Sequence, residues 1–177
     1  MLELLNPVNA YDALMEFLAA GGNVLVAIMA VTFVMWALIV ERLMYWSGAH
    51  GAVMKRAQRA WSTRSDHKSW YAHAVRERLI SETLQEATRF NGQIRALVAV
   101  TPLLGLLGTV TGMVEVFDVM AVTGSSNARL MAAGISKATI PTMSGLVASL
   151  SGLIFINAFD QNVKKATHQI SDELLIE

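Results

Sequence analysis

The sequence has 177 residues, of which 54% are apolar and only 16% charged, whereas about 25% is usual for a soluble domain. Fourteen Lys and Arg balance fourteen Asp and Glu, so the formal net charge is zero. This composition excludes a disordered chain and argues against nucleic-acid binding. Cysteine is absent, which excludes disulfides, thiolate metal sites and a cysteine nucleophile. The length predicts one domain, or one domain with a small appendage.

The N-terminal segment, residues 1–20, is predicted to be a short amphipathic helix that leads into a membrane span. It carries Glu3, Asp12 and Glu16 but neither Lys nor Arg. A secretory signal peptide begins with positive charge, so no cleaved signal is expected here.

Three uncharged stretches are long enough to cross a bilayer, namely residues 21–40, 96–114 and 138–159. A hydrocarbon core about 30 Å thick needs roughly 20 helical residues. The alternative is three buried core helices, which the rest of this short chain could not surround. The sequence therefore predicts an all-α integral membrane protein with three transmembrane helices.

The distribution of positive charge predicts the orientation. Residues 42–95 hold ten Lys and Arg, and the tail adds Lys164 and Lys165, whereas residues 1–20 hold none. Cytoplasmic loops carry the excess of Lys and Arg, so the N-terminus is expected outside and the C-terminus inside. The predicted parts are a periplasmic amphipathic segment (1–20), a first transmembrane helix (21–41), a cytoplasmic helical loop (42–95), a second transmembrane helix (96–120), a periplasmic link (121–129), a third transmembrane helix (130–160) and a cytoplasmic tail (161–177).

The cytoplasmic loop lacks proline and keeps an apolar stripe that runs toward the second span. The stripe comprises Ile80, Leu84, Ala87, Ile94 and Val98. This spacing predicts that the second helix starts well inside the cytoplasm and runs into the membrane. The charges of the loop are expected to be solvated, and the apolar stripe is interpreted as an oligomerisation surface. The long third helix is likewise expected to extend into the cytoplasm.

Five residues, three of them glycines, line one face of the second span. They follow spacings of 4, 3, 4 and 3, and are Thr101, Gly105, Gly108, Gly112 and Glu115. Because helices in lipid associate through close backbone approach, the three glycines predict tight packing against another helix. Gly145 in the third span is assigned the same role.

Each end of the second span carries a further feature. Pro102 removes a backbone donor, so a local bend is expected there. Glu115 and Asp118 lie near the outer end. They are interpreted as solvated interfacial carboxylates, with an outer ion vestibule as the alternative.

Lys137 is a charge at the edge of the third span. Inserting a lysine into the bilayer within a span costs roughly 3 kcal/mol. Such residues usually face the interior of the helix bundle or a water-filled cavity. Pro141 lacks the N–H that would bond the carbonyl of Lys137, so a second kink is expected at this turn. Lys137 is interpreted as facing a pore or a partner; snorkelling outward is the alternative.

Catalytic patterns are lacking. The four histidines, His50, His67, His73 and His168, are scattered without metal-ligand spacing. Neither a phosphate-binding glycine loop nor a nucleophile elbow is present. No enzyme activity, metal or cofactor is therefore expected.

Two sequence motifs resemble a known family. The run Thr101-Pro-Leu-Leu-Gly-Leu-Leu-Gly-Thr-Val-Thr-Gly-Met113 is similar to the A-P-x-x-G-L-x-G-T-V-x-G-[IM] signature of the MotA/TolQ/ExbB proton-channel family. The run Gly134-Ile-Ser-Lys-Ala-Thr-Ile-Pro-Thr-Met-Ser-Gly-Leu146 resembles its second signature, G-I-[AS]-x-A-[LT]-x-x-T-x-x-G-L. The short outer link resembles that of ExbB-like proteins more than that of the larger flagellar stator subunits.

The resemblance implies a homo-oligomer, a pentamer, in the inner membrane of Gram-negative bacteria. Its second and third spans would surround the single helix of an ExbD-like partner whose Asp carries protons. Proton flow would then energise a TonB-like protein for outer-membrane uptake of iron complexes, haem or cobalamin. The alternatives are a TolQ-like role in envelope integrity and division, or a passive membrane scaffold.

Three residues take their expected roles from the resemblance. The family threonines correspond to Thr109 and Thr142, which would lie along the proton path; ordinary helix packing is the alternative for both. Lys137 stands where ExbB and TolQ proteins commonly carry a glutamate. We expect the ammonium of Lys137 to pair electrostatically with the partner's Asp and to shift the pKa of that carboxyl group. Replacing Lys137 with Met should then impair uptake and weaken partner association.

Overall fold

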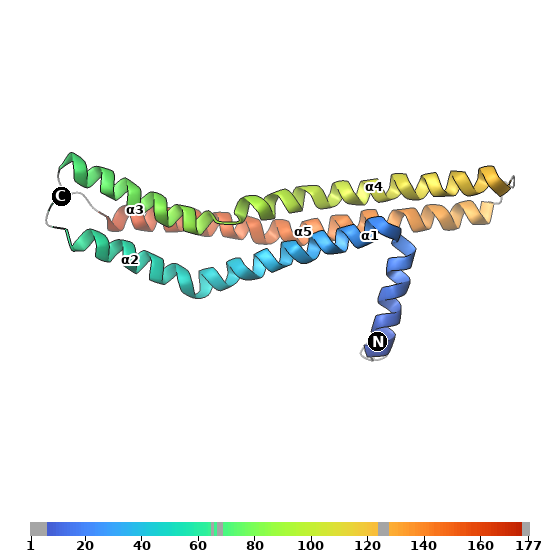
Figure 1. The fold of residues 1–177 in the computed structure, drawn as a ribbon, viewed down its shortest axis with the longest axis horizontal. Coiled ribbons are helices and arrows are strands. Elements are labelled where there is room, and N and C mark those ends of the chain that lie inside the picture. Colours follow the sequence, from blue (N-terminus) through green and yellow to red (C-terminus); the bar gives the residue numbers. More distant parts are fainter. Residues whose placement is uncertain (1–6, 65, 67–68, 124–127, 175–177) are drawn as a thin grey trace. The chain divides into compact units, whose positions relative to one another are not determined.

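The computed structural model describes residues 7–64, 66, 69–123 and 128–174, and every element among them is helical (Figure 1). The elements are α1 (Pro7–Met44), the π-helix η2 (Tyr45–Ala49), α2 (His50–Ser62), α3 (Trp70–Thr88), α4 (Asn91–Thr123) and α5 (Ala128–Glu173). Residues 1–6 of the predicted amphipathic segment and residues 124–127 of the predicted link lie outside this description. The chain divides into two compact units, Met1–Met35 with Leu97–Ser151 and Trp36–Ala96 with Gly152–Glu177.

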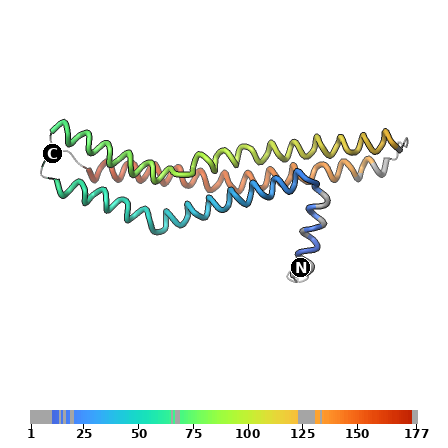
Figure 2. The backbone as a smooth tube through the Cα atoms, in the orientation of Figure 1, coloured from blue at the N-terminus to red at the C-terminus, as the bar shows by residue number. Residues whose placement is uncertain are grey.

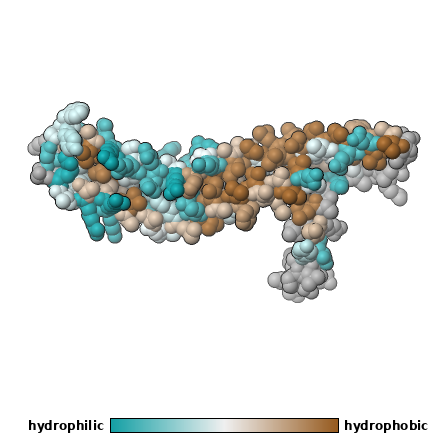
Figure 3. Space-filling view, in the orientation of Figure 1, coloured by the Kyte–Doolittle hydropathy of each residue, from teal (hydrophilic) through white to brown (hydrophobic). Residues whose placement is uncertain are grey.

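Among the residues that the structure describes, three helical stretches are long and apolar enough to cross a membrane. They lie within Gly21–Ser62, Trp70–Val122 and Gly134–Glu173. Hydrophobic side chains cover much of the surface of the α4–α5 pair, whereas hydrophilic ones dominate over α2 and α3 (Figure 3). The described residues thus confirm the prediction of an all-helical chain with three helices apolar enough to span a membrane. The predicted orientation and the cytoplasmic extensions stay predictions.

The first unit pairs α4 with α5 in antiparallel fashion, next to the N-terminal part of α1. Side-chain hydroxyls of α5 bond to backbone carbonyls of α4 at two levels: Thr142 Oγ1 donates to Gly105 O at 2.8 Å, and Ser149 Oγ donates to Val98 O at 2.9 Å. Helix α1 is kinked at Gly22, whose φ of 64° is a left-handed value that glycine adopts without a side-chain clash. The tube drawing shows α1 changing direction there (Figure 2).

The second unit contains α2, α3 and the C-terminal part of α5. Its core is a cluster of buried side chains, Met54, Ala57, Trp61, Ala72, Ile170 and Leu174. Arg76 closes the end of α5, because its guanidinium donates to Leu174 O at 2.6 Å and to Ser171 O at 2.9 Å. Ser171 O belongs to the last turn of α5, whose carbonyls lack partners within the helix, and Leu174 O follows that turn directly.

The helix expected to start in the cytoplasm and run into the second span is divided in two. Helix α3 ends at Thr88 and α4 begins at Asn91, with Phe90 between them at a φ of 65°. Only a few per cent of non-glycine residues adopt a positive φ. The apolar stripe from Ile80 to Val98 therefore spans two helices, a break that periodicity alone could not reveal.

The helices continue beyond the limits of the predicted membrane spans, and those limits stay predictions. Helix α4 continues to Thr123 and α5 begins at Ala128, so helices take up both ends of the predicted link 121–129. The first transmembrane helix, predicted to end at 41, continues in α1 to Met44 and then through η2 into α2.

Candidate functional site

The contact between α4 and α5 is a seam of small residues. A methyl group at Gly145 would come within 2.8 Å of Thr101 O, and one at Gly105 within 3.0 Å of Pro141 O. A methyl group at Gly112 would meet Ala138 Cβ at 2.7 Å. Only glycine permits this closeness of the two backbones, as is typical of helix contacts in lipid.

Thr142 lies in this seam. Its hydroxyl donates to Gly105 O, an oxygen that has a second lone pair beyond the helical hydrogen bond. The side chain is half-buried, and α4 supplies its acceptor from a position where a larger residue would hold the helices apart. Thr142 is therefore a hydrogen-bonded link between the two helices that carry the family motifs.

Thr109 has a different environment. Its hydroxyl donates to Leu106 O of its own helix at 2.6 Å, and the side chain is partly exposed. No hydrogen bond joins it to Thr142. Thr142 thus forms a hydrogen bond between two helices, whereas Thr109 forms one within α4. Their assignment to a proton path stays a prediction.

Both predicted kink prolines lie within continuous helices. Pro102 is part of α4 and Pro141 of α5. Pro141 is fully buried, and a methyl group at Gly108 would collide with its ring. The ring of Pro141 thus occupies the space that Gly108 leaves, and this proline is a packing residue of the seam.

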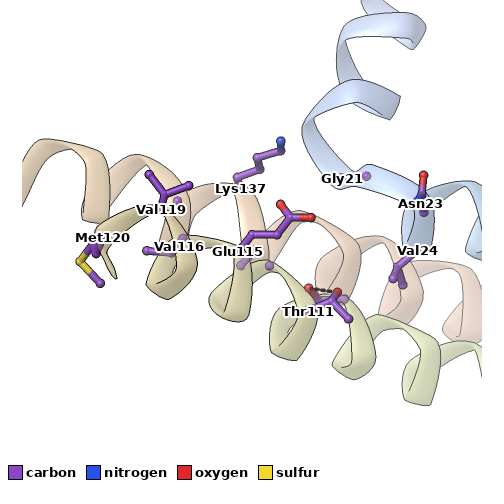
Figure 4. A pocket seen from close by; sticks show the side chains of 14 residues that line it. Gly21, Asn23, Val24, Thr111, Glu115, Val116, Val119, Met120 and Lys137 are labelled. Carbon is purple, nitrogen blue, oxygen red and sulfur yellow. Dashed lines mark hydrogen bonds between the residues drawn. The ribbon is translucent and has the colours of Figure 1, made fainter. Parts of the chain in front are cut away.

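A cavity of about 450 Å³ opens at one end of the seam, between α4, α5 and the kink of α1 (Figure 4). Glu115 from α4 and Lys137 from α5 line it, together with Asn23 from α1. Both charged side chains are exposed. Asp118 is also exposed but does not line this cavity. The structure therefore brings Lys137 and Glu115 to one cavity and leaves Asp118 outside it.

Sequence reasoning missed a buried cation in the second unit. Arg42 is 1% exposed, and its Nη1 donates to Glu86 O at 3.0 Å and to Ala87 O at 3.1 Å. Its guanidinium carbon lies 4.5 Å from the centre of the Tyr45 ring and 5.9 Å from that of Phe90. A positive charge just after an apolar run reads as an orientation marker, which hid this structural role.

Arg42 also explains the break between α3 and α4. In a continuous helix the carbonyls of Glu86 and Ala87 would accept the N–H groups of Phe90 and Asn91. Here both carbonyls face the guanidinium of Arg42 instead. Arg42 thus acts as the C-terminal cap of α3.

Among the described residues, no three His, Asp or Glu side chains gather as metal ligands would.

The sequence matches known proteins over most of its length. The profile of the MotA/TolQ/ExbB proton channel family matches residues 46–172. The ExbB-like 3 protein of Synechocystis sp. is 30% identical over 79% of this chain and 81% of its own length.

Matches to two proteins named biopolymer transport protein ExbB are shorter. The Pseudomonas putida protein is 30% identical over 54% of this chain, and the Salmonella typhimurium protein 32% identical over 49%. This chain covers only 29% and 36% of their respective lengths. The family profile includes α4 and nearly all of α5, and with them the seam of small residues. The chain therefore belongs to the MotA/TolQ/ExbB proton channel family.

Proposed function

We propose that this chain is the ExbB-like subunit of an inner-membrane proton channel and motor. With an ExbD-like partner it converts proton-motive force into energy for TonB-dependent uptake across the outer membrane, of iron complexes, haem or cobalamin. The observation that carries the proposal is the match of the family profile to the helices that form the α4–α5 seam.

Exposed apolar faces support assembly around a partner helix. Beside the seam, α4 exposes Leu103, Leu106 and Val110, and α5 exposes Met143 and Val147. In a bilayer such faces contact lipid or other helices. We propose that five copies of the chain use them to surround the single span of the partner, with Thr109 and Thr142 along the ion path.

The charge distribution supports an orientation with the N-terminus outside and the C-terminus inside. The Lys and Arg residues concentrate in residues 42–95, so α2 and α3 are proposed to lie in the cytoplasm. The cavity that holds Glu115 and Lys137 would then open toward the periplasm.

Complementation of a gene deletion tests the physiological output. The deletion strain is expected to lose uptake of a siderophore-bound iron label, and the wild-type gene to restore it. The native complex, purified through a tag on this chain, is expected to contain a single-span protein with an intramembrane Asp, and native mass spectrometry should count five copies. Normal uptake together with defective division would instead assign the TolQ-like role. A complex without a single-span partner would favour a passive scaffold.

A further inference from the structure

Two opposite charges share the cavity between α1, α4 and α5 without bonding to each other. Figure 4 shows the carboxylate of Glu115 and the ammonium of Lys137 extending toward the open space beside the α1 kink. In the part of the chain that the structure describes, neither group has an ion-pair partner within 4.0 Å. Both charges are therefore available to a ligand.

The cavity lies at the end of all three uncharged stretches. Gly21 begins the first of them, Glu115 is the first charge after the second, and Lys137 is the last charge before the third. The headgroup layer of a bilayer meets a protein at the ends of its spans. A ligand at this level can come from the headgroup layer, whichever side of the membrane this end occupies.

Apart from Asn23 and Thr111, the rest of the lining consists of apolar side chains and glycines. Val24, Val116, Val119 and Met120 contribute side chains, and glycines of all three helices complete the wall. The kink at Gly22 directs the start of α1 away from the regular helix path at the cavity. A space of about 450 Å³ is within the range of small-molecule sites. Apolar walls next to two charges suit an amphiphile better than a free ion.

We propose that this cavity binds the headgroup of a phospholipid that carries both a phosphate and a primary ammonium, as in phosphatidylethanolamine. Lys137 Nζ donates to the phosphate, and the ammonium of the lipid donates to the Glu115 carboxylate. Such charge-assisted hydrogen bonds are the strong ones. This inference goes beyond the proposed channel function and does not depend on the orientation of the chain.

The predicted ligand of Lys137, an aspartate of a partner helix, is the competing assignment. An aspartate here would share the cavity with Glu115, and like charges at close range repel each other. A zwitterion avoids this conflict because it offers each protein charge its opposite. Three helices of this chain, α1, α4 and α5, contribute to the lining of the cavity.

Lipid retention by the purified complex tests the proposal. The complex is placed in nanodiscs with equal parts of phosphatidylethanolamine, phosphatidylcholine and phosphatidylglycerol, then released and analysed by native mass spectrometry. The wild type is expected to retain phosphatidylethanolamine about ten-fold over the other two, the effect of roughly one strong polar interaction. Glu115→Gln should remove the preference for phosphatidylethanolamine over phosphatidylglycerol. Lys137→Met should abolish the retention of both phosphatidylethanolamine and phosphatidylglycerol.

A matched control and a charge exchange complete the design. Asp118→Asn removes an exposed carboxylate of α4 outside the cavity and should keep the wild-type pattern. Glu115→Lys combined with Lys137→Glu should regain the preference that either single change loses. The proposal is overturned if the wild type has no preference, or if Asp118→Asn lowers retention as much as Glu115→Gln. It is also overturned if Lys137→Met keeps the lipid but loses the partner protein, which would support the aspartate.

Discussion

At the scale of single residues, the candidate site depends on glycines, whose lack of a side chain lets two helices approach closely. The backbones of α4 and α5 approach at Gly105, Gly112 and Gly145, where one added methyl group would meet a neighbouring atom at 3.0 Å or less. The approach brings Thr142 within hydrogen-bond reach of the α4 backbone. A polar contact of this kind between helices is worth about 0.6 kcal/mol on average in a membrane. This hydrogen bond alone therefore contributes modestly to the contact between α4 and α5.

Gly145→Ala tests this packing. The new methyl group would lie 2.8 Å from Thr101 O and 3.2 Å from Gly105 Cα, so the helices must separate. Overpacking of this kind costs about 1–3 kcal/mol. The expected result is a lower melting temperature and a lower yield of assembled complex in detergent.

Gly51→Ala is the matched control. Gly51 lies in α2, and a methyl group there would meet nothing within 4 Å. Alanine in an open helical position stabilises by roughly 0.5–1 kcal/mol relative to glycine. Equal melting temperatures for the two variants would contradict the close approach of α4 and α5.

At the scale of elements, Arg42 determines where one helix ends and the next begins. Its guanidinium takes the carbonyls of Glu86 and Ala87, and α4 then starts afresh at Asn91. The end of α1 is thereby tied to the turn that precedes α4. This tie lies within the second unit, so its effect should be seen first in α3.

Arg42→Met tests the capping role. The variant leaves two carbonyls without their donor in a buried place, which we expect to cost about 3 kcal/mol. Hydrogen exchange should become faster in the last turn of α3, and the melting temperature should fall. Arg78→Met is the control, since Arg78 is exposed and pairs with Glu82, four residues further along the same helix. Unchanged exchange at the end of α3 in Arg42→Met would refute the role.

The sequence predicts the helices better than the breaks and kinks between and within them. The three spans follow from charge-free length, and the small-residue seam follows from the spacing of Gly105, Gly108 and Gly112. The break at Phe90 does not, because it is caused by Arg42, which lies more than forty residues earlier in the chain. The kink at Gly22 is visible only as a glycine pair at the start of a span, a pattern that many straight helices also contain.

The residues of the candidate site could be predicted from the sequence, but the contacts that their side chains make could not. The motifs single out Thr109, Thr142 and Lys137. Sequence cannot tell that Thr142 bonds across to α4 while Thr109 bonds within it. Nor can it tell that Lys137 shares a cavity with Glu115. These contacts depend on the rotation of each helix about its axis, which periodicity fixes only approximately.

At the scale of the whole molecule, zero net charge conceals an asymmetric chain. Residues 1–20 carry only acids, and ten of fourteen Lys and Arg fall in residues 42–95. This asymmetry supports the proposed orientation, which places α2 and α3 in the cytoplasm and the charged cavity at the outer surface.

Single-cysteine labelling tests this orientation, because the chain has no cysteine of its own. Asp12→Cys and Lys55→Cys place thiols at exposed positions in α1 and α2. A maleimide that crosses the outer but not the inner membrane should label the first in intact cells. The second should be labelled only after the inner membrane is permeabilised. The reverse pattern would show the opposite orientation.

Proton flux through the reconstituted complex is the most direct test of the proposed function. The complex with its single-span partner is placed in liposomes with an internal pH dye, and a membrane potential is imposed. The wild type should acidify or alkalinise the lumen according to the sign of the potential. Thr142→Ser, which keeps the hydroxyl, should behave like the wild type. Thr142→Val should slow the flux about ten-fold, equivalent to roughly 1.4 kcal/mol in the barrier. An intact wild-type complex that passes no protons at either sign of the potential would contradict the channel function.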